Sequence, residues 1–415
     1  MQKTSARDPS DLIDSGYAWF RLLATLLIST VGGAGMWSVV VVLPAVQAEF
    51  GVARADASLP YTLTMVCFAA GGILMGRLAD RFGVIVPCVI GAFALAIGYV
   101  GASFTTSILQ FALVHGFVIG LLGSSAFFGP LIADASFWFR NRRGLAVSIA
   151  ASGNYLAGTV WPPLVQYMTD TMGWRQAYVV VGLVSMLMML PLTLALRRRP
   201  PMDLAPSSPA AAALSAQRTP MVSPNMLQAL LMIAGVSCCV AMSMPQVHMV
   251  AYCADLGYGA ARGAEMLSLM LGFGIVSRLA SGWIADRIGG FATLLLGSVL
   301  QMVALMLYVP FDGLMSLYVI SALFGLFQGG IVPSYAIIVR ENFSPREAGT
   351  RVGAVLMSTL VGMALGGWMT GAVFDYTGSY QTAFLNGILW NVLNIAIVLW
   401  LMRRRRPAAP AAAMA

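Results

Sequence analysis

Residues Gly76–Gly83 read GRLADRFG, and residues Gly282–Gly289 read GWIADRIG, so the same Ala-Asp-Arg step recurs after 206 residues. Each stretch follows a long apolar run. Two other pairs of positions repeat at an interval of 205 residues, Gly144 with Gly349 and Asp170 with Asp375. Agreement of separate stretches to within one residue indicates that the chain contains one structural unit twice.

The composition places this chain in a membrane. Of its 415 residues, 59% are hydrophobic and 10% are charged, with a mean hydropathy of +0.82. A soluble domain carries about 25% charged residues, so this chain lacks the polar surface to face water on all sides. The 43 glycines suit closely packed transmembrane helices. The five cysteines show no metal-binding spacing, and we expect neither a metal nor a cofactor.

Twelve apolar runs are long enough to cross a bilayer, which needs about 20 residues per helix. We therefore predict an all-α membrane protein with twelve transmembrane helices. The runs lie at Phe20–Pro44, Pro60–Ala79, Val84–Ala102, Ile108–Ala133, Leu145–Tyr167, Ala177–Leu196, Leu227–Ala251, Ala264–Ile284, Ala292–Val309, Leu314–Val339, Val352–Val373 and Ala383–Met402.

The distribution of arginine predicts the orientation. If the N-terminus is cytoplasmic, the segments on that side hold 20 of the 24 basic residues. Cytoplasmic segments carry such an excess of Lys and Arg, so we expect both termini inside, in a cell inner membrane. Topology then explains the net charge of +8, and no nucleic-acid partner is needed. The other basic residues are Arg54, Arg175 and Arg262 in outside loops, and Arg278 within a run.

The repeat and the spans together predict the domain organisation. Six spans bring the chain back to the same side, so the two halves form parallel repeats related by an axis along the membrane normal. We predict an N-terminal half over residues 1–199 and a C-terminal half over 225–406. Residues 200–224, rich in Pro, Ala and Ser, read as a flexible cytoplasmic linker, and 407–415 as a disordered tail.

The chain resembles the major facilitator superfamily along its whole length, because it has two six-span halves and the motif G-x-L-A-D-R-x-G at Gly76–Gly83, between spans 2 and 3. This resemblance implies transport by alternating access. It also implies a cytoplasmic gate. Asp80 would cap the helix of span 11 near Glu347–Gly349, and Asp286 would act likewise near Arg142 and Arg143; simple solvation of these loops is the alternative. The gating residues would be Gly76, Asp80, Arg81, Gly83, Asp286, Arg287, Arg142 and Arg143.

Two further stretches are similar to the monocarboxylate transporter branch of that family. One is Asp14–Trp19 (DSGYAW) before span 1, and the other is Trp138–Ala146 (WFRNRRGLA), which continues to Gly153. Family members carry an Arg in span 8 that meets the substrate carboxylate, and Arg278 occupies the matching place. Animal members often have an Asp four residues earlier and a Lys high in span 1; the corresponding residues here are Gly274 and Trp37. Oxalate–formate exchangers, a related branch, have a second basic residue in span 11, which residues 352–373 lack.

Arg278 is the most informative residue of the chain. An ionised guanidinium within a span costs at least ~2.5–3.5 kcal/mol, and such residues usually serve function. The midpoint of span 8 is near Gly274, which places the Arg278 backbone about 6 Å from the centre of the bilayer. Its planar fork binds a carboxylate in a bidentate manner. We expect a substrate site here without an obvious permanent acidic partner; snorkelling to the headgroups or a structural pair is the alternative.

Other polar or aromatic residues within the spans are candidates for the same site. His248 would bind substrate or handle protons where Pro245 breaks its helix; otherwise it is an interfacial histidine. Asn154 and Tyr155 would hydrogen-bond a substrate hydroxyl or ketone, as would Gln328; otherwise they join helices. Trp37 would form a wall of the cavity, or else pack in the core or against lipid. His115 reads more readily as a packing residue.

The sequence therefore predicts a secondary carrier of small monocarboxylates such as lactate or pyruvate, acting as a monomer in the lipid bilayer and coupled to protons by resemblance. A carboxylate exchanger or exporter of amphipathic organic anions is one alternative, and a sensor that binds an anion without moving it is another. We find no HExxH, no phosphate loop and no carboxylate pair within the spans, so we expect no enzyme activity.

Overall fold

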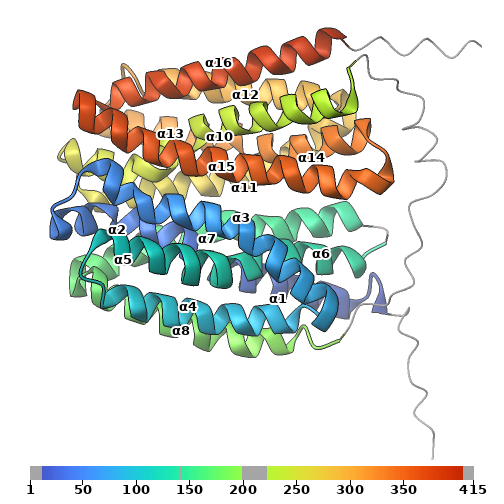
Figure 1. Ribbon diagram of the computed structural model, residues 1–415, viewed down its shortest axis with the longest axis horizontal. Coiled ribbons are helices and arrows are strands. Elements are labelled where there is room, and N and C mark those ends of the chain that lie inside the picture. Colours follow the sequence, from blue (N-terminus) through green and yellow to red (C-terminus); the bar gives the residue numbers. More distant parts are fainter. Residues whose placement is uncertain (1–11, 141, 199–221, 405–415) are drawn as a thin grey trace, which may run out of the picture.

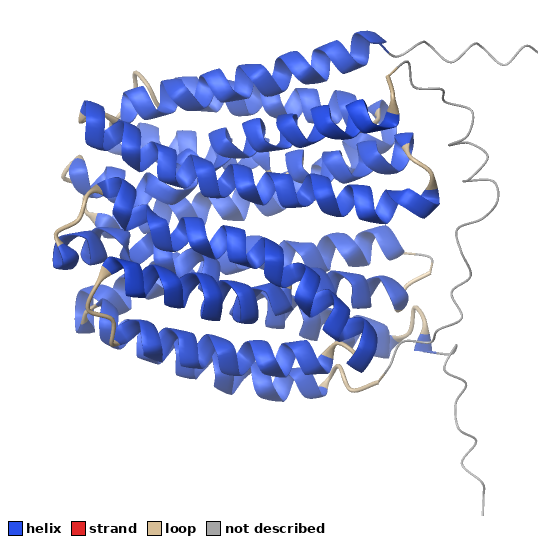
Figure 2. Cartoon of the chain, in the orientation of Figure 1, coloured by secondary structure: helices blue, strands red, loops and turns tan. Residues whose placement is uncertain are grey.

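The computed structural model describes residues 12–140, 142–198 and 222–404, and the regular structure within them is helical (Figures 1 and 2). Eleven stretches of these residues are long and apolar enough to span a membrane. The 30-residue helix α7 packs among them and makes the twelfth span. The predicted all-α fold of twelve transmembrane helices is confirmed.

The first six spans contain the elements α1 to α8. Span 1 is α1 and α2, and span 4 is built from α5, η2, η3 and α6. The bounds are α1 Gly16–Gly32, α2 Ala34–Phe50, α3 Arg54–Phe82, α4 Ile85–Ser103, α5 Ile108–Leu113, η2 Val114–Gly123, η3 Ser124–Phe127, α6 Gly129–Phe137, α7 Arg143–Met172 and α8 Trp174–Leu194.

The second six spans contain the elements α10 to α16. Span 10 consists of α13 and α14, which are separated at Gly329 and Gly330. The bounds are α10 Pro224–Asp255, α11 Ala260–Ile288, α12 Gly290–Leu307, α13 Leu314–Gln328, α14 Ile331–Asn342, α15 Pro345–Thr377 and α16 Tyr380–Arg404.

The described chain begins and ends on one face of the bundle. Residue 12 precedes α1 and residue 404 ends α16, both at the right of Figure 1. We call this face the terminal side and the opposite face the far side. Because α3 follows span 1 through a short turn, α3 runs from the far side at Arg54 to the terminal side at Phe82. By the same alternation α11 runs toward the terminal side, while α7 and α15 start there.

The last glycine of each repeated motif ends a helix. Gly83 after α3 has a φ of +87°, and Gly289 after α11 has a φ of +82°. Residues other than glycine are strained at such positive φ angles. The amide of Gly83 donates to the carbonyl of Ala79 (2.8 Å), and that of Gly289 donates to Ala285 (2.9 Å). The repeated motif thus builds the same tight exit from both helices.

Each half packs around its own long helices. Within the N-terminal half α4 lies along α8, and within the C-terminal half α10 lies along α15 and α16. Two pairs of helices form most of the contact between the halves, α7 with α11 and α3 with α15, and α2 also contacts α10 and α11. Most of the sequence assigned to the linker and all of that assigned to the tail lie outside the described residues.

A buried ion pair in the N-terminal half was not expected from the sequence, in which Arg21 is one of the 20 basic residues assigned to the cytoplasmic side. Arg21 and Asp134 are both buried, and their side chains form two hydrogen bonds of 2.9 and 3.0 Å. The guanidinium also lies over the ring of Trp138, 4.5 Å from its centroid. This pair holds α1 against α6 at the terminal side, and its Arg contributes no free charge there.

Asp134→Asn should destabilise the protein strongly. The substitution leaves the Arg21 guanidinium buried without its carboxylate, and breaking such pairs costs about 3–5 kcal/mol. The matched control is Glu347→Gln, which breaks the i,i+4 pair of the exposed Glu347 with Arg351, worth about 0.3–0.5 kcal/mol. We expect the melting temperature in detergent to fall clearly for Asp134→Asn alone; equal melting temperatures for the two variants would contradict the role of the pair.

Candidate functional site

Arg278 lies on α11 and reaches across to the other half of the protein. Its Nη1 donates to the backbone carbonyl of Ala151 on α7, at 2.9 Å. Its guanidinium carbon lies 4.5 Å from the centroid of the Tyr155 ring, a cation–π contact. The side chain is half-buried, and its Nε is buried without a hydrogen-bond partner among the described residues. The guanidinium thus spans the boundary between the halves.

The ring of Tyr155 is held in place by a glycine. A Cβ atom at Gly274 would lie 2.4 Å from a carbon of the Tyr155 ring, so only glycine lets the ring lie this close to α11. Tyr155 and Arg278 therefore contact each other because residue 274 has no side chain. This is the position at which animal monocarboxylate transporters often have an Asp, according to the resemblance described above.

Trp37 and Asn154 complete this cluster from α2 and α7. The Trp37 indole donates to the backbone carbonyl of Asn154 at 3.1 Å and lies 3.3 Å from its side-chain oxygen. The Trp37 ring also contacts Gly158, and Leu271 of α11 packs against the same glycine. Four predicted site residues from three helices are therefore brought together: Trp37, Asn154, Tyr155 and Arg278.

The cluster combines one cation with aromatic and amide groups. None of the ion pairs formed within residues 12–140, 142–198 and 222–404 involves Arg278. The ring of Tyr155 and one carbonyl oxygen stabilise the guanidinium only in part, because neither carries a full negative charge. A carboxylate is the acceptor that such a guanidinium binds most strongly.

The side chain of Gln328 forms no hydrogen bond with this cluster among the described residues, although the next residue, Gly329, packs against the backbone of Gly274 and Arg278. Gln328 is the last residue of α13, is fully buried, and accepts a hydrogen bond of 2.9 Å from the Gln246 side chain of α10. This contact lies within the C-terminal half. His115 is also buried away from the cluster, where its Nε2 lies 3.0 Å from the Tyr178 hydroxyl. It packs among aromatic residues, as the sequence indicated.

His248 lies at the other boundary between the halves. Its Nε2 is 2.8 Å from the carbonyl of Gly367 on α15 and 3.5 Å from the Ser58 hydroxyl on α3. The expected break at Pro245 does not occur, because α10 continues from Pro224 to Asp255 around it. His248 is buried, and its Nδ1 has no partner among the described residues. His248 therefore lies at the contact of α3 with α15, whereas Arg278 lies at the contact of α7 with α11.

A network at the far side, which sequence reasoning missed, ties α3 to the C-terminal half. The Asp375 carboxylate at the end of α15 accepts from the backbone amides of Arg54 (2.9 Å) and Ala55 (2.8 Å). The residue preceding α3 is Ala53, which offers no side-chain cap. Asp375 therefore caps α3 from the other half, where helix ends favour an acidic group.

The Arg54 side chain strengthens the same junction. It is buried, donates to the Tyr380 hydroxyl at 2.6 Å and pairs with Asp255 at 3.1 Å. Its guanidinium carbon lies 4.9 Å from the Phe374 ring centroid. The repeat of Asp170 as Asp375 was the only signal for this network, and it did not reveal that Asp375 reaches the other half. We call Arg54, Asp255, Asp375 and Tyr380 the far-side latch.

Five of the eight predicted gating residues are exposed at the terminal side, and Gly76 and Gly83 are half-buried. Asp80, Arg81, Asp286, Arg287 and Arg142 are exposed, and no ion pair links them within the described part of the chain. The side chain of Arg143 lies outside the described residues. Of the hydrogen bonds between the halves in the described residues, Arg278 to Ala151 lies nearest the terminal side. The structure is thus closed at the far side. The role of the gating residues when the terminal side closes stays a prediction.

Comparison with known proteins decides the family. The family model described as Major Facilitator Superfamily matches residues 25–318 and 311–414. The chain belongs to the major facilitator superfamily. The resemblance inferred from the repeated motif is confirmed, and the protein is a multi-pass membrane transporter.

Similar proteins point to one branch of the superfamily. The transporter is 27% identical to monocarboxylate transporter 13 of Bos taurus over 380 residues, which cover 90% of this chain and 86% of the relative. It is 26% identical to monocarboxylate transporter 11 of Mus musculus, over 91% and 86% of the two chains. It is also 25% identical to the MFS-type transporter opdF of Penicillium oxalicum, over 82% and 80%.

Solved structures support the same fold. A bacterial homologue of the human lysosomal transporter Spinster, in an inward-facing and occupied conformation, superposes with a TM-score of 0.72 at 16% identity, covering 96% of this transporter and 100% of that chain. A point mutant of the nucleoside transporter NupG gives a TM-score of 0.71 at 16% identity, covering 93% and 100%. At this identity the likeness establishes the fold.

Asp375→Asn should loosen the far side of the transporter. The amide weakens the cap on α3, since the charge that favours a helix N-terminus is lost. Spin labels at Asp56→Cys and Tyr376→Cys, both exposed, should then report a broader and longer distance distribution. The matched control is Asp170→Asn, because this repeat counterpart accepts only from Gln166 of its own helix among the described residues. Identical distributions for wild type and Asp375→Asn would rule out the latch.

Proposed function

We propose that this transporter is a secondary carrier of small monocarboxylates, of the size of lactate or pyruvate, that moves them with protons by rocking of its two halves. The observation that carries the proposal is the Arg278 guanidinium, which lies between α7 and α11 and forms no ion pair within the described residues. The relatives named monocarboxylate transporters support the substrate class. A single cation matches a single carboxylate.

The contacts of Arg278 suggest how binding leads to movement. Its hydrogen bond to the Ala151 carbonyl joins the two halves at 2.9 Å. A substrate carboxylate is the stronger acceptor and would take over this donor. Substrate binding then removes one link between α7 and α11 while the far-side latch is still closed. We infer that release of this link lets the halves rock around the site, as alternating access requires.

The proposed location is a cell inner membrane, and the arginine distribution supports an orientation with both termini in the cytoplasm. The terminal side would then be cytoplasmic, and the transporter as described would face the cytoplasm. No oligomeric contact is needed for the proposed site, because its residues all come from one chain.

Arg278→Ala should abolish most of the transport. Loss of a charge-assisted hydrogen bond removes about 2 kcal/mol of binding, which is roughly a 30-fold reduction in uptake at low substrate concentration. The measurement is uptake of labelled pyruvate or lactate into proteoliposomes with an inward acid step. Arg278→Lys should retain part of the activity, because the positive charge stays while the planar guanidinium that binds a carboxylate in a bidentate manner is lost. Uptake that ignores both the pH step and Arg278→Ala would reject the proposal.

Counterflow distinguishes the second candidate, an exchanger of organic anions. None of the groups that contact the Arg278 guanidinium among the described residues is acidic, and this observation supports exchange without protons. Loaded proteoliposomes should then take up labelled carboxylate at uniform pH only when unlabelled carboxylate is inside. Uptake driven by an acid step into empty proteoliposomes favours the proton-coupled carrier instead.

Gly274→Ala should impair transport although the charge of Arg278 is kept. The new methyl group would lie 2.4 Å from the Tyr155 ring, which must move from beneath the guanidinium. The matched control is Gly272→Ala, where the added Cβ would meet Thr159 at an ordinary 3.6 Å. We expect uptake to fall several-fold for Gly274→Ala and to stay near wild type for Gly272→Ala. Equal uptake by both variants would show that the position of the Tyr155 ring does not matter.

A further inference from the structure

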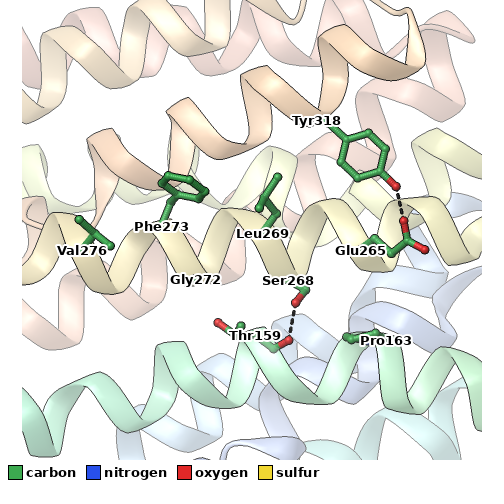
Figure 3. Close-up of a pocket in the computed structure, with 9 residues that line it drawn as sticks. All are labelled: Thr159, Pro163, Glu265, Ser268, Leu269, Gly272, Phe273, Val276 and Tyr318. Carbon is green, nitrogen blue, oxygen red and sulfur yellow. Dashed lines mark hydrogen bonds between the residues drawn. The ribbon is translucent and has the colours of Figure 1, made fainter.

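A groove of about 530 Å³ runs between α7 and α11 and is unrelated to the Arg278 cluster (Figure 3). Leu269, Gly272, Phe273 and Val276 of α11 line its length, and Pro163 of α7 forms the opposite wall. Its volume lies within the 300–1,000 Å³ typical of ligand sites. Most of the lining is apolar, and the polar groups gather toward the start of α11.

The groove faces away from the interior of the protein. On α11 the residues Leu267, Leu271, Gly274 and Arg278 recur at helical spacing and point to the other half or the core. The groove residues Leu269, Gly272 and Val276 lie on the opposite face of the helix, by the 3.6-residue period. Phe273 is 39% exposed and Val276 is 54% exposed. In a membrane protein this face of α11 contacts the hydrocarbon of the bilayer.

Two opposite charges lie at the far-side end of the groove. Glu265 lines it, is 43% exposed, and accepts hydrogen bonds from the Tyr318 hydroxyl of α13 and from the Arg262 guanidinium (3.0 Å). Arg262 is 53% exposed. Because α11 starts at Ala260, both charges lie near the membrane surface, where lipid headgroups are found. The groove thus combines an apolar channel at acyl-chain depth with a carboxylate and a guanidinium at headgroup depth.

We propose that this groove is a binding site for one phospholipid with an ethanolamine headgroup. One acyl chain would lie along Leu269, Gly272 and Val276, the phosphate would meet Arg262, and the ammonium would donate to Glu265. Charge complementarity favours this lipid, because its headgroup offers a phosphate to Arg262 and an ammonium N–H to Glu265, whereas a serine headgroup would bring a further carboxylate close to Glu265. A choline headgroup has no N–H to donate to the carboxylate, and a glycerol headgroup carries no positive charge. This inference goes beyond the transport of carboxylates and does not depend on it.

The position of the groove links the lipid to conformational change. Its walls come from both halves, and at its floor the Ser268 hydroxyl of α11 donates to the Thr159 carbonyl of α7 (Figure 3). When the halves rock, Pro163 and Thr159 move relative to α11 and the groove changes shape. The bound lipid therefore favours the conformation in which the far side is closed, because a ligand stabilises the state that it binds better.

Photocrosslinking tests the site directly. The purified transporter is placed in nanodiscs of phosphatidylcholine and phosphatidylglycerol with a trace of phosphatidylethanolamine that carries a diazirine on one acyl chain. After irradiation and trypsin digestion, label should concentrate on the peptide 263–278, which trypsin releases between Arg262 and Arg278. Unlabelled phosphatidylethanolamine should reduce this label at least tenfold more effectively than phosphatidylcholine. Label spread evenly over all bilayer-facing peptides would overturn the proposal.

Two variants separate the channel from the headgroup contact. Gly272→Trp should fill the groove and remove the label from peptide 263–278, whereas Leu187→Trp, at a 73% exposed position of α8, should leave it unchanged. Glu265→Gln keeps the shape of the side chain and should abolish the preference for phosphatidylethanolamine. A preference that survives Glu265→Gln, or equal competition by phosphatidylcholine, would overturn the proposal. The assay contains no carboxylate substrate, so its outcome is independent of the proposed transport function.

Discussion

A guanidinium shared by two half-domains is the interaction on which this structure depends. Arg278 belongs to α11, yet its hydrogen bond and its cation–π contact are both with α7 of the other half. A charge at this depth is costly in lipid, and the transporter reduces that cost with an aromatic face and one carbonyl rather than with an acid. The guanidinium keeps hydrogen-bond donors without a partner among the described residues, such as its Nε, and a carboxylate can accept from them. In the proposed mechanism, binding and the movement of the halves therefore involve the same side chain.

The pair α3 and α15 has an acidic residue at each end, and the two ends differ in the observed state. At the far side Asp375 of α15 caps α3 with two backbone hydrogen bonds. At the terminal side Asp80 of α3 is exposed near the start of α15. The two helices run antiparallel, so the end of each lies near the start of the other. If Asp80 caps α15 when the terminal side closes, as the family resemblance implies, the two closed faces would use the same chemistry.

The sequence alone predicted the transmembrane helices and the fold, because hydropathy is a property of contiguous segments. It also identified Arg278 and the residues that gather around it. It did not reveal that Gly274 positions the Tyr155 ring, since that contact joins positions 119 residues apart in the chain. Arg54 and Asp375 were missed for a similar reason. Arg54 read only as a charge in an outside loop and Asp375 only as the repeat of Asp170, and their contact depends on the packing of α3 on α15. His248 was expected beside a helix break, but the continuous α10 buries it against Gly367.

The replacement of an acid by Gly274 connects these observations. An Asp at this position would pair with Arg278, lower the cost of the charge and offer a proton acceptor next to the substrate. Glycine instead admits the Tyr155 ring, which stabilises the cation but accepts no proton at ordinary pH. The charge that must be compensated when substrate leaves is then borne by the Ala151 carbonyl and the ring alone. In the proposed mechanism such a site would favour the anion-bound state more strongly than an acid-paired site, because the guanidinium gains a full negative charge only when the anion binds.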